Sequence, residues 1–311
     1  MSINQLAQPQ VTATSARFLL IGYLPTYGAA LYLLTLVWAD TPEGRPHWAA
    51  AWKTAEQLTA GELVLLAVTI TIVAVLLQPL QLALVRLLEG QWPQPLRPLA
   101  DAGRARQTRA RDKLRLIERR AEDAATDPGP QDVQAAGAAG ARLRRRFPAS
   151  GPVRATALGN ALAAAEERAG AVYGWDAVVA WPRLHPLLSD QVRAVVNDRR
   201  DLLDATARLS VTSAATALVS IALVARSGPW LLLVLAPFVV SRIAYHGAVH
   251  AAQAFGDSLD TAFDLHRFDL LEALHLPLPD TPAGERALAA ELSLMWRQGV
   301  PSDRPYRHGS A

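Results

Sequence analysis

The stretch SRIAYHGAVHAAQAFGDSLDTAFDLHR, residues 241–267, directly follows the apolar run PWLLLVLAPFVV. At about 100° per residue, small side chains and polar side chains fall on opposite sides of a helix through it. The small side holds Ala244, Gly247, Ala251, Ala254, Ser258 and Ala262. The other side, which we name the polar stripe, holds Arg242, His246, His250, Gln253, Asp257, Asp260, Asp264 and Arg267. Because small residues let helices approach closely, one long helix with a packing side and a polar side is predicted.

Four apolar segments are long enough to cross a bilayer, which requires about 20 residues. They lie at 16–39, 63–88, 205–226 and 229–248. The purely apolar part of the last segment has only about 13 residues, so Arg242 either reaches the interface or is buried among other helices. With 51% hydrophobic and 19% charged residues, the composition agrees with a membrane-embedded fraction. We therefore expect an all-α integral membrane helical bundle with two transmembrane hairpins.

Charge between the segments predicts which side of the membrane each loop faces. Residues 97–120 hold nine Arg or Lys residues, whereas 40–62 hold only two. The positive-inside rule then makes 40–62 an extracytoplasmic loop and places both termini in the cytoplasm. The remaining parts are a flexible N-terminus at 1–15, a helical cytoplasmic insert at 89–204 with a flexible linker near 126–141, and a cytoplasmic tail at 249–311 that begins as an extension of the fourth span. The expected location is the bacterial inner membrane.

The two cytoplasmic parts carry opposite charge. Residues 89–204 contain 19 basic and 15 acidic side chains, and 249–311 contain five and nine, so the two parts can attract each other. The basic segment Arg104–Arg120 predicts a helix that contacts anionic lipid head groups, or one that is merely solvated beside the membrane and fixes topology. A net charge of +3 gives no support for nucleic acid as a partner.

Within the insert, Thr156 is placed to cap a helix that ends near Gly170. Asp176 and Arg183 follow among aromatic side chains that include Trp181. Buried charges are normally matched, so this group is either a structural ion pair or part of a ligand site. Residues 189–209 then predict a helix that continues into the third span.

Three stretches resemble a family of uncharacterised multipass membrane proteins from high-GC actinobacteria, for which no activity is assigned. They are LVRLLEGQWP at 84–93, LGNALAAAEERAGAVYGWDAVVAWPRLHPLL at 158–188 and FDLHRFDLLEALHLPLP at 263–279. The resemblance implies an architecture and no catalytic residues. The order of hairpin, insert and hairpin also looks like that of bacterial bestrophin-type anion channels, by layout alone.

His246 and His250 are four residues apart, a spacing that can place two imidazoles on one metal ion. His250 and Asp257 are roughly 10 Å apart along a helix axis, so one helix cannot surround an ion with both histidines and the aspartates. A divalent metal would need ligands from another helix or subunit. The chain has no cysteine, no phosphate-binding glycine loop and no His-Glu-x-x-His motif, so we expect no catalytic residue and no cofactor.

Three functions follow from these patterns. The first is a non-enzymatic, homo-oligomeric membrane protein that serves as an assembly or sensing platform. The second is an oligomeric ion channel whose cytoplasmic mouth is lined by the polar stripe, because charged rings tune ion entry. The third is a metal-dependent membrane enzyme at the cytoplasmic face.

Overall fold

The computed structural model describes residues 16–123, 129–302 and 304–307, and these residues form helices and connecting segments with no strand. The all-α prediction is confirmed over this part of the chain. The chain divides into two compact units, one from 89–201 with 249–311 and the other from 11–88 with 202–248. We name the first the polar unit and the second the apolar unit. The expectation for 1–15 lies outside the described residues.

The apolar unit contains α2 (Ala16–Trp38), η1 (Thr41–Glu43), α3 (Trp48–Glu56), α4 (Ala60–Leu88) and η5 (Gly228–Val234). It also holds the second part of α9 (Asp190–Val224) and the first part of α10 (Leu235–Ala273). In the described residues, two helical segments are long and apolar enough to cross a membrane, Asp190–Val224 and Gly228–Ala273. The first covers 205–224 of the span expected at 205–226, and the second contains the span expected at 229–248. A third is reached if α3 and the first part of α4, bent by 108°, count as one span.

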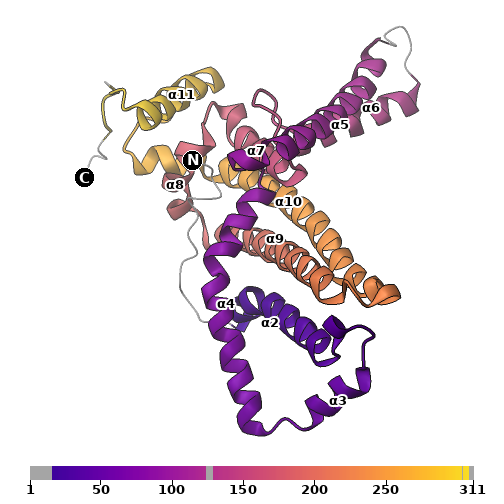
Figure 1. Cartoon of the computed structure of the whole chain (residues 1–311). Coiled ribbons are helices and arrows are strands. Elements are labelled where there is room, and N and C mark those ends of the chain that lie inside the picture. Colours follow the sequence, from indigo (N-terminus) through magenta and orange to yellow (C-terminus); the bar gives the residue numbers. More distant parts are fainter. Residues whose placement is uncertain (1–15, 124–128, 303, 308–311) are drawn as a thin grey trace. The chain divides into compact units, whose positions relative to one another are not determined.

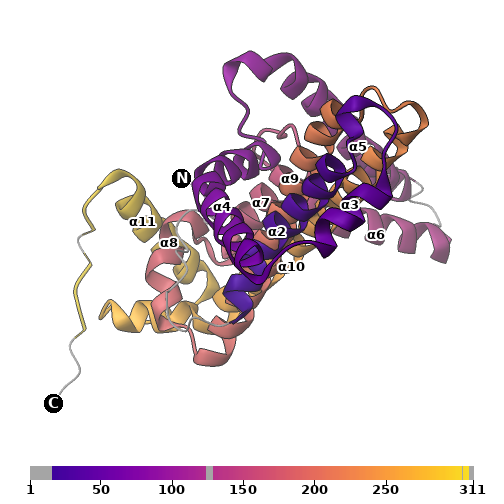
Figure 2. The ribbon, with the colours of Figure 1, turned by 60° about the horizontal axis from the view of Figure 1, so that its bottom comes forward.

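Helices α9 and α10 lie side by side (Figures 1 and 2), held by small residues. The hydroxyl of Ser210 donates to the carbonyl of Ser241 at 3.1 Å, and the hydroxyl of Ser241 donates back to the carbonyl of Ser210 at 2.9 Å. Ala244 is buried, and a side chain at Gly247 would contact Thr206. Small residues therefore do let these two helices approach closely, as the sequence predicts.

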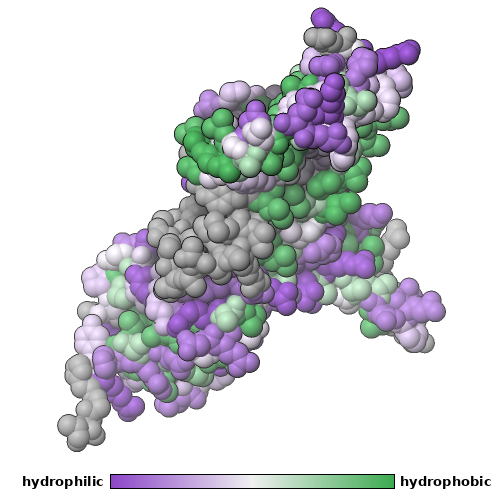
Figure 3. Space-filling view, turned by 90° about the horizontal axis from the view of Figure 1, so that it is seen from below, coloured by the Kyte–Doolittle hydropathy of each residue, from purple (hydrophilic) through white to green (hydrophobic). Residues whose placement is uncertain are grey.

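The outward faces of the same helices are apolar. The exposed fraction is 48–74% for four large apolar side chains: Leu218 and Ile221 of α9, Leu232 of η5 and Ile243 of α10. Figure 3 shows hydrophobic side chains gathered over continuous areas of the face that it draws. Exposed apolar area of this extent is unusual on a protein surrounded by water and suits a helix in contact with hydrocarbon.

Helices α2, α9 and α10 also border an apolar cavity of about 520 Å³, lined by small residues such as Gly28, Ala205 and Ala236. Its wall is fixed by the hydroxyl of Tyr32, which donates to the carbonyl of Leu233 at 2.6 Å. This hydrogen bond joins α2 to η5 within the apolar unit.

The polar unit contains η2 (Gln94–Leu96), α5 (Arg97–Asp123), α6 (Pro130–Arg146), α7 (Ala157–Arg168), η3 (Ala171–Tyr173), α8 (Ala177–Leu184), η4 (His185–Leu187) and α11 (Pro282–Gln298). Side-chain caps begin three of these helices. Thr156 accepts from the N–H of Gly159 at 3.0 Å, as predicted. Asp176 accepts from the N–H of Val178 at the start of α8, and Thr281 accepts from the N–H of Gly284 at the start of α11.

Helices α5 and α6 form a hairpin (Figure 1). This differs from the expectation of a flexible linker near 126–141, because residues 130–141 belong to α6. Pro130 is well suited to the first helical turn, and the alanines that follow favour helix over coil. Residues 126–128 of the expected linker lie outside the described part.

Candidate functional site

The second half of the polar stripe, from Asp257 to Arg267, lies in the polar unit, and its first part faces α7. Helix α7 can approach α10 because Gly256 carries no side chain. A Cβ at this position would lie 2.7 Å from Cβ of Ala165 and 3.2 Å from Nη2 of Arg168. Gly170, just beyond α7, turns the chain at φ +71°, and a Cβ there would lie 2.8 Å from the ring of Phe263. Two glycines therefore bring the end of α7 against α10.

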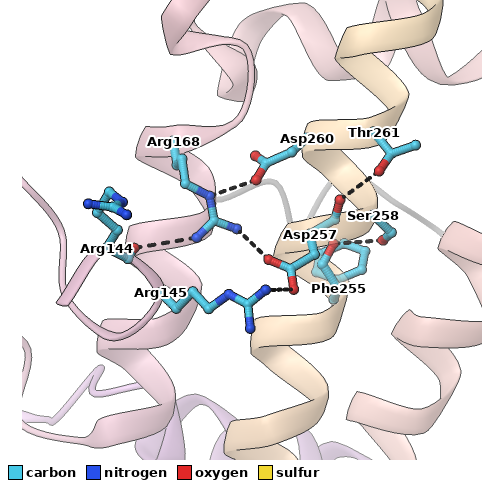
Figure 4. A network of polar contacts seen from close by, with 8 residues as sticks. All are labelled: Arg144, Arg145, Arg168, Phe255, Asp257, Ser258, Asp260 and Thr261. Atoms are coloured by element: carbon cyan, nitrogen blue, oxygen red, sulfur yellow. Dashed lines mark hydrogen bonds and ion pairs between the residues drawn. The ribbon is translucent and has the colours of Figure 1, made fainter. Parts of the chain in front are cut away.

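Arg168 binds two carboxylates of the stripe at once (Figure 4). Its Nε lies 2.7 Å from Oδ2 of Asp260, and its Nη2 lies 3.0 Å from Oδ1 of Asp257. The two aspartates are three residues apart, so they lie on the same face of α10. Arg145 of α6 reaches the other oxygen of Asp257 at 3.0 Å. We name Arg145, Arg168, Asp257 and Asp260 the arginine clamp.

Asp260 is the most deeply placed carboxylate of the clamp. Burial raises its pKa above the ordinary value, and the neighbouring charges of Asp257 and Asp264 act in the same direction. Arg168 opposes the shift without reversing it. The Oδ1 atom of Asp260 is buried and has no hydrogen-bond partner among the described residues. The clamp therefore holds a carboxylate whose ionised form is incompletely compensated.

The stripe continues into a second cluster. The hydroxyl of Tyr173 donates to Oδ1 of Asp264 at 2.8 Å, and this hydrogen bond is the main cause of a raised tyrosine pKa. Arg267 lies over the ring of Tyr173 at 4.0 Å and pairs with Glu285 of α11 at 2.7 Å. Glu285 is buried. Asp257, Asp260, Asp264 and Arg267 thus all have partners inside the polar unit.

The first half of the stripe, from Arg242 to Gln253, is mostly exposed. Arg242 is exposed and lies 5.9 Å from the ring of Tyr245, whose edge meets the ring of His246 at 6.2 Å. His250 is exposed, and the buried Nε2 of Gln253 has no partner among the described residues. Across the described ranges, His, Asp and Glu side chains form no group of three or more that could hold a metal ion. The geometry therefore lends no support to the metal hypothesis for His246 and His250.

Asp176 and Arg183 do not pair with each other in the structure, and both contact α11. Asp176 binds Arg297, and the guanidinium of Arg183 lies 4.4 Å from the ring of Trp296. Trp181 is 1% exposed and belongs to the core, next to Phe263. The charged residues of this motif serve to dock α11, which favours the structural interpretation over a ligand site.

A cavity of about 470 Å³, with several charged side chains in its lining, lies between this motif and α7. Arg154, Glu166, Glu167, Asp176 and Arg297 contribute its charges. Burial raises the pKa of Glu167, but hydrogen bonds from Ser150 and neighbouring backbone N–H groups outweigh it and leave the pKa lowered. The ionised glutamate thereby ties the loop at 149–151 to α7.

Sequence patterns locate the acidic half of the clamp and miss the basic half. Arg168 belongs to AAAEERAG, a composition too general to indicate a role. Its partners are 89 and 92 residues away, so only tertiary structure brings them together. The one available signal was the opposite net charge of the insert and the tail, which predicts attraction without naming a pair.

Comparisons with known proteins add no identification. No family model, no curated protein and no solved structure matches the chain. The resemblance to the actinobacterial membrane proteins stays a prediction.

Proposed function

We propose that this chain is a non-enzymatic, homo-oligomeric protein of the bacterial inner membrane whose cytoplasmic helices form an assembly or sensing platform. In this proposal it crosses the membrane four times, with both termini in the cytoplasm. The long apolar helices α9 and α10 support the membrane location. Helix length supports two of these four spans, in α9 and α10. We assign the other two to the apolar segments in α2 and α4.

The arginine clamp is the observation that carries the platform function. Acidic side chains that line a pore or bind an ion must be open to it, whereas the aspartates of the clamp are paired with the chain's own arginines. Ion pairs between α6, α7 and α10 give a fixed helical surface, which suits a binding platform.

An oligomeric ion channel is the second candidate. It is favoured by Arg242 and His250, which are exposed on α10 in the first half of the stripe. Such side chains would line a vestibule if several copies placed α10 around one axis.

Reconstitution of the full chain separates the two candidates. Native mass measurement in nanodiscs should give a particle with more than one chain, and liposomes should show no ion leak at any voltage or pH. Liposomes treated with an ionophore provide the positive control. A monomeric particle would contradict the oligomer, and a conductance that changes in His250→Ala would replace the platform with the channel.

A further inference from the structure

Helix α5 carries two faces at helical spacing. Positions 103, 107, 111, 114 and 118 are half-buried and recur at steps of four, four, three and four. Contacts on this side include Glu118, whose Oε1 lies 2.7 Å from the site of a Cβ at Gly140 of α6. The half-buried face therefore packs against α6 and against neighbouring residues of the same chain.

The opposite face is exposed along its whole length, and we name it the basic stripe. It comprises Leu99, Ala102, Arg106, Arg109, Lys113 and Leu116, at steps of three, four, three, four and three. The two leucines, at its ends, are 59% and 52% exposed. From Leu99 to Leu116 the stripe extends over roughly 25 Å.

The three cations of the basic stripe have no ion pair with any described side chain. The ion pairs of α5 join Arg104 to Asp101 and Arg111 to Asp112 instead. A row of uncompensated cations with exposed leucines at both ends is the composition of helices that lie on an anionic membrane surface. Only residues 89–98 separate Leu88, the end of α4, from the first leucine of the stripe.

We infer that the basic stripe of α5 docks on the phosphate groups of anionic lipids, with Leu99 and Leu116 entering the interface. The occupant follows from charge complementarity and from the short connection to an apolar helix. This inference rests on the membrane location proposed above. It makes the α5–α6 hairpin a lipid-responsive element of the platform.

The test uses the full chain in nanodiscs, where both membrane faces are accessible. Because the chain has no cysteine, Ala102→Cys can carry a single fluorophore in the stripe, and Gln298→Cys can carry the same label on α11. Quenching by acrylamide, which is uncharged, reports exposure. With phosphatidylglycerol in the bilayer, the label at 102 should be shielded several-fold relative to pure phosphatidylcholine, and the label at 298 should not change.

Charge variants test the cause of the shielding. Arg109→Gln with Lys113→Gln should weaken docking roughly 30-fold, since each cation near an anionic surface contributes about a factor of five. Arg286→Gln with Arg307→Gln removes the same charge from exposed positions outside α5 and should leave docking unchanged.

Equal quenching in the two lipids, or shielding that survives loss of the two cations, would overturn the inference. Shielding produced only by an added oligonucleotide would assign the stripe to nucleic acid instead. Incorporation of the chain into the nanodisc, checked separately, distinguishes a failure of docking from a failure of the membrane proposal.

Discussion

Arg168 shows how much of this fold depends on a single side chain. Its guanidinium joins two aspartates one helical turn apart, and its side chain is 24% exposed, so solvent screens these contacts only in part. The regular spacing of Asp257, Asp260 and Asp264 predicts an acidic face on a helix. No local pattern predicts that an arginine at the end of α7 pairs with two of these aspartates.

Asp260 should make the stability of the chain depend on pH. The unfolded carboxyl ionises near its ordinary pKa of 3.8, and the folded one at a higher pKa. Between these values the folded state binds more protons, so stability falls as pH rises through the window. Asp260→Asn, which keeps an acceptor for Arg168, should lack this fall. Chemical unfolding of the solubilised chain, followed by tryptophan fluorescence at several pH values, measures the difference between the two proteins. If the free energy of unfolding of wild type rises relative to that of Asp260→Asn as pH rises, the effect of Arg168 on the pKa of Asp260 outweighs that of burial.

At the scale of elements, helices with strong local signals are predictable and their packing is not. Thr156 caps α7, and the long helices α9 and α10 contain 190–209 and 241–267, as their spacing indicates. Residues 130–141 form helix where glycines suggested a linker, because packing against α5 stabilises them. For helix α11, whose Arg297 and Glu285 complete two ion pairs, the sequence offered only the opposite net charges of tail and insert and indicated neither pair.

Gly256 should be required for the contact of α7 with α10. Gly256→Ala places a methyl group 2.7 Å from Cβ of Ala165, and relieving such an overlap typically costs about 1–3 kcal/mol. Gly137→Ala in α6 is the matched control, since nothing lies within 4 Å of its added carbon. The free energy of unfolding of the control should rise by about 0.5–1 kcal/mol, because alanine has a higher helix propensity than glycine. Free energies of unfolding that rise equally in both variants would show that α7 does not pack closely on α10.

At the scale of the whole molecule, apolar length and loop charge lead to one arrangement of four spans. Two of the four rest on helices that are long and apolar enough in the structure. The other two rest on the apolar segments within α2 and α4 and on the scarcity of basic residues in 40–62. The sequence therefore predicts the topology more fully than it predicts a function.

Single cysteines test this topology in intact cells, because the natural chain has none. Gln57→Cys, Gln131→Cys and Gln298→Cys are three exposed positions with the same substitution. A membrane-impermeant maleimide should label only the first, and permeabilised cells should show labelling of all three. Labelling of Gln131→Cys in intact cells would place the insert outside and reverse the orientation.

Arg168 pairs with Asp257 and Asp260 of the polar stripe and so holds α7 of the insert against α10. A double-mutant cycle with Arg168→Ala, Asp260→Ala and the combined variant measures this coupling directly. We expect a coupling free energy of about 1–2 kcal/mol in the unfolding of the full chain, as for other hydrogen-bonded charge pairs. The exposed pair of Arg193 and Asp190, 3.2 Å apart, should show no measurable coupling in a parallel cycle. Additive effects at Arg168 and Asp260 would contradict the clamp and return the stripe to the role of an open surface.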